Sequence, residues 1–319
     1  MDGRVEPAVG AVPRLPGAHR GHPVRLSPAR RGGPLRGGAG RPRRAPTPAG
    51  REAPGGPPPH RPPGPDPLVT AFAGFSEGAG AYARHRPAYP AALADALAEL
   101  APARRLAWDA GCGSGQLSTL LGERFDRVVA SDASAEQVAH ARPHPRVEYR
   151  IAPAGESGLP ADSVDLAAAA QAAHWFDLDA WFAEVARVAR RGAAVAMVTY
   201  GDVEVEGAPG RVVDRFNRET LAPWWAPERR HVVDGYASLD LPFARVAVRV
   251  PDMTAEWDAD ALLGYVGTWS AVRALEGAGG RETIDAFAEE VRRAWGPGRR
   301  GVRWPLTVRA GRVRAERPG

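Results

Sequence analysis

Lysine is absent from the 319-residue sequence, and cysteine occurs once, at Cys112. All 42 basic side chains are therefore arginine, which we interpret as a compositional bias and not as selection for phosphate binding. A single cysteine excludes a disulfide within the chain and fits a reducing compartment, so we expect a cytoplasmic location. No apolar run approaches the roughly 18 residues of a membrane-spanning helix, and the basic N-terminus lacks the apolar stretch of a secretory signal. We therefore expect no membrane partner.

Charge is distributed unevenly along the chain. Residues 1–66 hold 12 Arg and 4 acidic residues, a net charge of +8, whereas the other 253 residues hold 30 Arg and 33 acidic residues, a net charge of −3. The larger part is slightly acidic, which argues against a basic groove for nucleic acid, so we expect no nucleic-acid partner. An RNA- or membrane-binding role for the basic N-terminal segment stays open as an alternative.

Composition divides the chain into three parts. Residues 1–67 are dominated by Pro, Gly and Arg, and they cannot bury enough apolar surface to offset the entropy of ordering, so we predict a disordered extension. Residues 68–202 are expected to form an α/β core that binds a cofactor. Residues 203–319 are expected to add cap helices and edge strands that complete the same domain.

Apolar segments of strand length alternate with amphipathic segments through the core. The expected strands are 105–111, 127–133, 147–154, 163–171 and 193–200. The expected helices include 90–100, one beginning near Ser118, one that Ser134 and Gln137 cap, and 179–191 with Gly192 in the C-terminal capping position. Such alternation predicts a parallel sheet covered by helices on both faces, whose ligands bind at the carboxyl ends of the strands.

The C-terminal third is rich in Trp and Tyr. Residues 244–250 and 305–311 are typical of strands, and we expect them at the far edge of the same sheet. Helices near 258–274 and 282–295 are expected between these strands, where they would form a cap over the mouth of the site.

The strongest motif is WDAGCGSGQLS at residues 108–118. Gly111, Gly113 and Gly115 allow the backbone to turn sharply and to approach a ligand without interference from a Cβ atom. Asp132 ends the next expected strand, 21 residues after Gly111. At that position a carboxylate can accept hydrogen bonds from both hydroxyls of a ribose.

A dinucleotide site is the natural competitor for this motif. Its fingerprint requires a third small residue at the position that Gln116 occupies here. Asp109 precedes the first glycine, where an acidic side chain repels a pyrophosphate but can hold an ammonium group directly or through water. The motif therefore favours a ligand with a ribose and a cationic amine over a ligand with phosphates.

Together these features resemble the class I S-adenosylmethionine-dependent methyltransferases, and within them the UbiE-like and trans-aconitate methyltransferase-like group. The similar segments are FSEGAGAYARHRPAYP (75–90), WDAGCGSGQ, ASDAS (130–134), GLPADSVDLAAAAQAAHWFD (158–177) and GYVGTWSAVRAL (264–275). The resemblance covers nearly everything from about 72 to 312. It implies a Rossmann-like α/β fold with a seven-stranded sheet of order 3-2-1-4-5-7-6, an antiparallel seventh strand, and S-adenosylmethionine as the cofactor.

The resemblance also implies further cofactor contacts. Tyr82 and Arg86 would fold over the cofactor, with Arg86 as the charge partner of its methionyl carboxylate. Gln171 would touch the methionyl part, and Gln116 belongs to the glycine-rich motif itself. Many relatives carry Ala-Glu after the third strand, where this chain reads Ala154-Gly155-Glu156, so the contact to the adenine edge falls to the Ala154 backbone or to Glu156. The alternative for the first two residues is the solvated start of a helix.

Acceptor residues are expected after the fourth strand and in the cap. His174 would orient an acceptor or take its proton, because an unperturbed imidazole titrates near neutrality; the alternative is a structural histidine packed on Trp175. Trp269 and Arg273 are four residues apart on an expected helix, so they share a face that could receive a carboxylate bidentately. The alternative is that these side chains only pack within the cap. Residues 229–231 are a second, weaker candidate for receiving a carboxylate.

The expected activity is methyl transfer from S-adenosylmethionine to a small molecule that carries a carboxylate or a hydroxyl. The alternatives are a nucleic-acid methyltransferase that uses the basic N-terminal segment, and a non-catalytic module that binds the cofactor. No cluster of Cys, His and carboxylate residues has metal-ligand spacing, so we expect no metal. Neither the identity of the acceptor nor the oligomeric state follows from the sequence.

Overall fold

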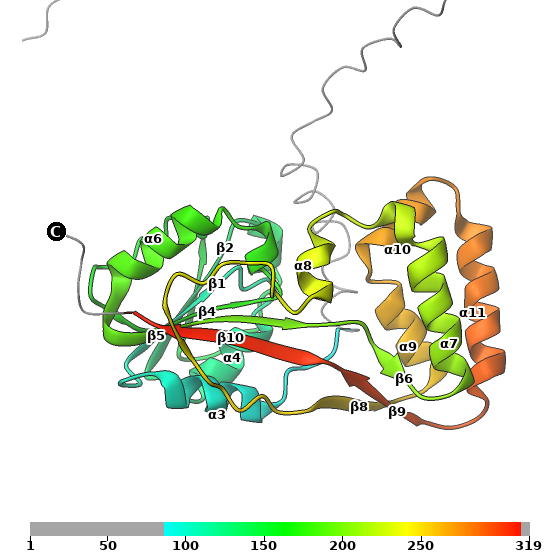
Figure 1. Ribbon diagram of the computed structural model, residues 1–319, viewed down its shortest axis with the longest axis horizontal. Coiled ribbons are helices and arrows are strands. Elements are labelled where there is room, and N and C mark those ends of the chain that lie inside the picture. The colour runs from blue at the N-terminus through cyan, green and yellow to red at the C-terminus, as the bar shows by residue number, and fades with distance from the viewer. Residues whose placement is uncertain (1–85, 314–319) are drawn as a thin grey trace, which may run out of the picture. The chain divides into compact units, whose positions relative to one another are not determined.

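The computed structural model describes residues 86–313, and its centre is a seven-stranded sheet of order β3-β2-β1-β4-β5-β10-β7 (Figure 1). The strands are β1 (Leu106–Ala110), β2 (Arg127–Asp132), β3 (Val147–Ile151), β4 (Val164–Ala170), β5 (Ala189–Tyr200), β7 (Ala244–Val246) and β10 (Leu306–Arg312). Counted within this sheet alone, the order is 3-2-1-4-5-7-6, as predicted. The first five strands are parallel, and β10 is antiparallel to both β5 and β7, which confirms the expected topology.

Helices cover both faces of the sheet. They are α3 (Ala91–Leu100), α4 (Gln116–Gly122), α5 (Ala135–Ala139) and α6 (Leu178–Val188). Figure 1 shows α3 and α4 on one side of the sheet and α6 on the other. Leu97 and Leu121 of the first two helices are fully buried in one apolar cluster with Leu166 of β4, whereas Trp181 and Val185 of α6 belong to a second cluster. This burial on both faces explains why the central strands are almost wholly apolar.

The cap contains a small sheet as well as the expected helices. Its helices are α7 (Ala208–Arg215), continued by a π-helix (Phe216–Thr220), η3 (Ala222–Trp224), α8 (Arg229–Val233), α9 (Ala259–Val266), α10 (Ser270–Gly277) and α11 (Arg281–Trp295). Its antiparallel sheet has the order β6-β9-β8, with β6 (Glu204–Val205), β8 (Met253–Trp257) and β9 (Arg300–Trp304). The cap helices that the sequence predicts are present, and the small sheet was not among the predicted elements. Burial alternates along β8 and β9, and the rings of Trp257 and Trp304 pack 4.8 Å apart.

The predicted helix over 179–191 with Gly192 as its cap is wrong at its C-terminal end. The helix ends at Val188, and β5 begins at Ala189, which pairs with Val164. The register between β4 and β5 then shifts before Leu166. Gly192 has a φ of 78° within β5, so its left-handed conformation serves an irregular strand and not a helix end.

Two boundaries in the C-terminal third also differ from the prediction. The strand expected over 244–250 pairs only as far as Val246. The single helix expected near 258–274 is divided into α9 and α10, because the Thr268 hydroxyl donates to the Tyr265 carbonyl at 2.6 Å and the chain becomes extended at Trp269.

The predicted disordered segment, residues 1–67, lies outside the described residues. Across 86–313, no helix combines the length and the apolarity that crossing a lipid bilayer requires.

Candidate active site

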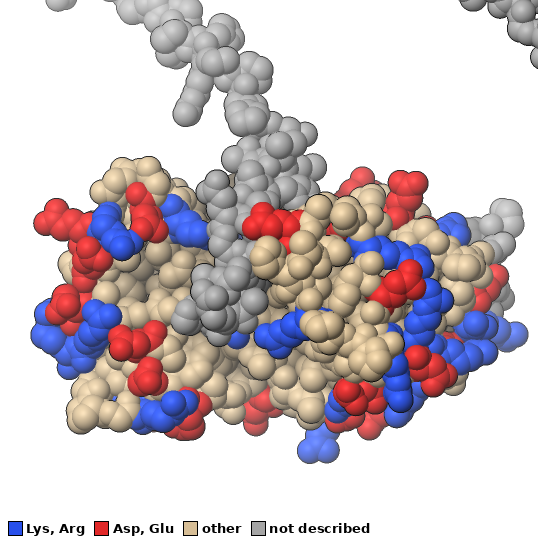
Figure 2. Space-filling model, turned by 180° about the vertical axis from the view of Figure 1, so that it is seen from behind, with Lys and Arg blue, Asp and Glu red and all other residues tan. Residues whose placement is uncertain are grey.

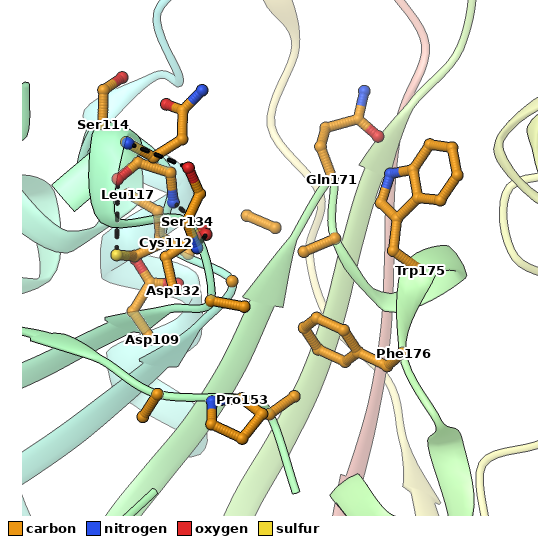
Figure 3. Close-up of a pocket in the computed structure, with 18 of the residues that line it drawn as sticks. Asp109, Cys112, Ser114, Leu117, Asp132, Ser134, Pro153, Gln171, Trp175 and Phe176 are labelled. Carbon is orange, nitrogen blue, oxygen red and sulfur yellow. Dashed lines mark hydrogen bonds between the residues drawn. The ribbon is translucent and has the colours of Figure 1, made fainter. Parts of the chain in front are cut away.

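A cavity of about 490 Å³ lies at the carboxyl ends of β1, β2 and β4, where parallel sheets bind their ligands. Figure 3 shows Asp109 and Asp132 on one wall and Gln171, Trp175 and Phe176 on the other. The sequence motif around 108–118 and the segment after β4 therefore meet across one space, as the strand order requires.

Each glycine of the loop between β1 and α4 has a positive φ, of 66° at Gly111, 53° at Gly113 and 79° at Gly115. A Cβ atom at Gly111 would lie 2.6 Å from the Ala172 Cβ, and one at Gly115 would collide with the Tyr149 hydroxyl. The protein's own packing therefore requires glycine at these two positions, and the expected close approach of a ligand stays a prediction. At Gly113 the nearest atom would be 3.7 Å away, so this glycine alone leaves room beside the loop.

Asp132 ties the glycine loop to the end of β2. Its two carboxylate oxygens accept hydrogen bonds from the backbone N–H groups of Gly113 and Ser134, each at 2.8 Å. Burial raises the pKa of this carboxyl, and the two N–H groups oppose that rise. A carboxylate oxygen can accept a second hydrogen bond, so both oxygens remain able to bind the two hydroxyls of a ribose.

Asp109 is 1% exposed and lies on the same wall as Asp132. Ser118 donates to its Oδ2 at 2.6 Å, while its Oδ1 is buried and meets no hydrogen-bond partner within residues 86–313. Burial raises its pKa to about 7, and the charge of Asp132 adds to the rise. A buried carboxylate oxygen without a donor is costly, and a cationic amine in the cavity would satisfy it.

The other residues expected at the cofactor are brought to the same cavity. Gln116, Ala154, Glu156 and Gln171 all line it, and the Gln116 amide nitrogen is buried without a partner among the described residues. Sequence reasoning missed several lining residues, namely Tyr89, Ser134, Phe176, Asp177, Ala180 and Tyr200. Tyr200 ends β5, so the rule that ligands lie at strand carboxyl ends could have identified it.

Gln171 stands between this cavity and a smaller one. Its φ is 53°, an uncommon conformation for a residue other than glycine. Its Oε1 accepts from the Thr199 hydroxyl at 2.6 Å, and its Nε2 donates to the Tyr200 carbonyl at 3.2 Å. The end of β5 therefore fixes the side chain of Gln171.

The smaller cavity, of about 100 Å³, shares Gln171, Trp175 and Tyr200 with the larger one. His174 lines it from the core, and Trp269 and Arg273 line it from the cap. The structure thus brings together the residues that the sequence assigned to an acceptor. Trp269 immediately precedes α10 and is not within one continuous helix with Arg273, although the Arg273 N–H donates to its carbonyl at 3.2 Å.

Three arginines and one aspartate are among the residues that line the smaller cavity. Arg229 forms an ion pair with Asp202 and lies 3.7 Å from the centre of the Trp225 ring. Arg273 donates to the Thr268 carbonyl at 3.3 Å. The cavity therefore carries an excess of positive charge that favours an anionic ligand.

Arg86 was expected at the methionyl carboxylate, but it lines the smaller cavity and not the larger one. Its Nη1 donates to the Tyr200 hydroxyl at 3.0 Å. Its predicted contact with the cofactor stays a prediction. Tyr82, assigned to the same role, lies outside the described residues.

His174 differs from its expected state. Its Nδ1 lies 2.8 Å from the Tyr236 hydroxyl, and its ring lies 4.8 Å from that of Trp175. Burial lowers the pKa of His174 to about 3, and the charges of His231 and Arg86 contribute to the shift. Burial therefore favours the neutral ring, so His174 does not keep the unperturbed pKa on which its expected role as a base rested; that role stays a prediction.

No group of three or more His, Cys, Asp or Glu residues that could hold a metal occurs between residues 86 and 313.

Comparison with known proteins gives concordant matches. The family profile described as a methyltransferase domain matches residues 108–197. A protein of Dictyostelium discoideum named as a methyltransferase is 30% identical over 218 residues, which is 67% of this chain and 83% of that protein. A solved structure from Anaeromyxobacter dehalogenans, described as a type II methyltransferase, is 48% identical with a TM-score of 0.67 and covers 72% of this chain and 99% of that one. A Mycobacterium tuberculosis protein named as an uncharacterized methyltransferase is 40% identical over 125 residues, 39% of this chain and 51% of its own length.

The glycine loop supplies a first prediction. Gly115→Ala should lower the free energy of unfolding by about 2–5 kcal/mol, because the alanine adds backbone strain and displaces the Tyr149 hydroxyl. Gly279→Ala is the matched control: its φ is 87°, but nothing lies within 4 Å of the new Cβ, so we expect a loss of about 1–2 kcal/mol. Urea unfolding followed by tryptophan fluorescence measures both, and equal losses would contradict the packing argument.

A second prediction concerns the stability of the ligand-free protein as a function of pH. The pKa of Asp109 rises on folding from 3.8 to about 7, so the folded state holds the proton more tightly than the unfolded state. Its contribution to stability is complete below about pH 4 and is lost as the pH rises through about 7. The melting temperature of Asp109→Asn relative to the wild type should therefore increase between pH 5 and pH 8.

Differential scanning calorimetry at several pH values provides the measurement. Because only the change with pH is compared, any constant effect of the new amide cancels. Parallel curves for the two proteins would show that Asp109 does not carry this shift.

Proposed function

Because this chain belongs to the class I S-adenosylmethionine-dependent methyltransferases, we propose that it methylates a small molecule on a carboxylate or a hydroxyl. The observation that carries the proposal is the pair of cavities that share Gln171, Trp175 and Tyr200. The larger cavity would hold S-adenosylmethionine, and the smaller one would hold the acceptor. The narrower assignment to the UbiE-like and trans-aconitate methyltransferase-like group rests on the sequence motifs and is part of the proposal.

The larger cavity has the donors and acceptors that the cofactor needs. We assign the ribose hydroxyls to Asp132 and the ammonium group to the buried Oδ1 of Asp109. Ala154 and Glu156 line the part of the cavity next to β3, where the adenine edge is expected. The apolar ring of Phe176 on the opposite wall supplies a surface on which the cofactor can pack.

The smaller cavity supports a small anionic acceptor. Its volume of about 100 Å³ suits a group of few atoms, and Arg86 and Arg273 bring guanidinium groups to its wall. A methyltransferase that acts on nucleic acid would instead be expected to have an extended basic surface. Figure 2 shows acidic and basic side chains interspersed over the face of the molecule in view.

S-adenosylmethionine bound in the larger cavity would supply a methyl group activated by its bond to a cationic sulfur. An acceptor oxygen would gain a bond to that methyl carbon, and the electron pair of the carbon–sulfur bond would remain on sulfur. The protein's contribution is to align the acceptor and to exclude water, which can supply roughly 7–11 kcal/mol. Gln171, held by β5, lies where the two cavities join and so limits the path between them. An ionised carboxylate needs no base, which suits the neutral, weakly basic His174 better than a hydroxyl acceptor does.

We place this reaction in the cytoplasm, as the single cysteine indicates. We also propose that residues 68–202 and 203–319 act as one catalytic domain. β7 and β10 from the second segment extend the sheet of the first, and the cap supplies Trp269 and Arg273 to the acceptor cavity.

Cofactor binding tests the assignment of Asp132. Asp132→Ala should raise the dissociation constant for S-adenosylmethionine at least about tenfold, because two charge-assisted hydrogen bonds are lost. Asp126→Asn, an exposed change at the other end of β2, should leave it unchanged. Isothermal titration calorimetry on full-length variants with wild-type circular dichroism spectra gives both values. Unchanged binding by Asp132→Ala would overturn the assignment.

Turnover tests the acceptor class. Incubation with S-adenosylmethionine and a panel of carboxylic acids, alcohols, phenols and an RNA oligonucleotide should yield S-adenosylhomocysteine with carboxylic acids, and mass spectrometry of the products identifies the methylated atom. Arg273→Met should raise the KM for the acceptor about tenfold or more, since a guanidinium–carboxylate contact is lost. The exposed Arg218→Met is the control. Methylation of RNA, or binding without turnover, would instead favour a nucleic-acid enzyme or a non-catalytic module.

A further inference from the structure

Tyr236 is fully buried, and its hydroxyl lies 2.8 Å from the Nδ1 of His174 although the two residues are 62 apart in sequence. We propose that Tyr236 is a positioning residue that donates its phenol proton to Nδ1, so that the neutral His174 presents an Nε2–H donor to the acceptor oxygen. The inference rests on the proposed function, because it assigns the smaller cavity to an acceptor. It deepens that function by making His174 a donor and not a base.

The backbone holds Tyr236 firmly in this place. Its φ is 63°, and the preceding Gly235 is also left-handed, with a φ of 64°. The Tyr236 N–H donates to the His231 carbonyl at 2.7 Å, and the guanidinium of Arg309, on β10, donates to the carbonyls of both Tyr236 and Leu239. An uncommon backbone conformation persists only where its surroundings determine it, and here the central sheet itself does so.

The groups around the phenol oxygen decide the direction of its hydrogen bond. Among residues 86–313, the hydrogen-bond partner of this oxygen is the Nδ1 of His174, at 2.8 Å. Tyr236 is fully buried, and an Nδ1–H directed at its oxygen would leave the phenol O–H without an acceptor, which is costly. Nδ1 therefore accepts the phenol proton.

The tautomer follows from this direction. A neutral imidazole carries one proton, so with Nδ1 accepting, the proton lies on Nε2. His174 lines the smaller cavity, and Nε2 is the ring nitrogen that Tyr236 leaves for a ligand. An N–H donor holds an oxygen that already bears negative charge and cannot remove a proton from a hydroxyl. The acceptor class is therefore one whose oxygen is ionised before it binds, such as a carboxylate.

The tautomer can be measured without any turnover. Two-dimensional ¹⁵N–¹H spectra of the full-length protein labelled on its eight histidines report which ring nitrogen carries the proton, and His174→Gln assigns the signal by its loss. We expect the Nε2–H form in the wild type at pH 7 and a mixture of both tautomers in Tyr236→Phe. Tyr149→Phe, which removes a hydroxyl bonded to the Arg142 carbonyl, should leave the signal unchanged. A wild-type Nδ1–H tautomer would overturn the inference.

Steady-state kinetics with an acceptor identified in the panel show whether His174 acts as a hydrogen-bond donor or as a general base. His174→Gln keeps an N–H near the position of Nε2, so we expect it to retain at least a tenth of the wild-type kcat/KM, whereas His174→Ala should lose about a hundredfold. Equal losses in the two variants would overturn the donor role. Tyr236→Phe should raise the acceptor KM about three- to tenfold with little change in kcat and none in the dissociation constant for S-adenosylmethionine.

The two measurements distinguish failure of this inference from failure of the proposed function. If no small molecule is methylated but the wild type shows the Nε2–H tautomer that Tyr236→Phe disturbs, the positioning by Tyr236 stands and the proposed function fails. If carboxylic acids are methylated and the tautomer is Nδ1–H, the function stands and this inference fails. Methylation of an alcohol with His174→Gln inactive would overturn the donor role and restore that of a base.

Discussion

The carboxylate of Asp132 joins the glycine loop after β1 to the segment that follows β2. One oxygen accepts the N–H of Gly113 from the loop after β1, and the other accepts the N–H of Ser134 after β2. Because the carboxylate is largely buried, these bonds are needed to offset its desolvation. They hold the glycine loop against the end of β2, where both Gly113 and Asp132 line the larger cavity.

Asp109 lowers the stability of the ligand-free protein but suits the cavity to the binding of a cationic group. Its carboxylate is buried beside Asp132 with one oxygen satisfied by Ser118, so its ionised form is costly in the ligand-free protein. A cationic group in the cavity would offset that cost, so the ionised carboxylate of Asp109 is more stable in a complex than in the ligand-free protein. Polar groups that reduce the stability of the free protein are typical of sites that are organised in advance for a ligand.

The smaller cavity is lined by the cap as well as by the sheet. Gln171 and Tyr200 come from strand ends, whereas Trp269 and Arg273 come from α10 and the residue before it. One apolar cluster runs from the sheet face into the cap, where the rings of Tyr265, Trp269 and Trp304 pack edge to face. This continuous packing gives the cap a defined position, so that Arg273 lines the same cavity as residues of the core.

The local sequence pattern determined much of the fold of the core and the location of several site residues. The helices on both faces and the meeting of Asp109, Asp132 and Gln171 at one edge follow from the sequence pattern, because parallel strands place their carboxyl ends together. The order of the central strands was implied by the family resemblance and not by local pattern. Other features arise only from the tertiary structure. β6, β8 and β9 pair over long separations, Arg86 lines the smaller cavity, and Tyr236 reaches His174 from beyond α8. The low pKa of His174 likewise comes from burial and from charges distant in the chain, which no local motif encodes.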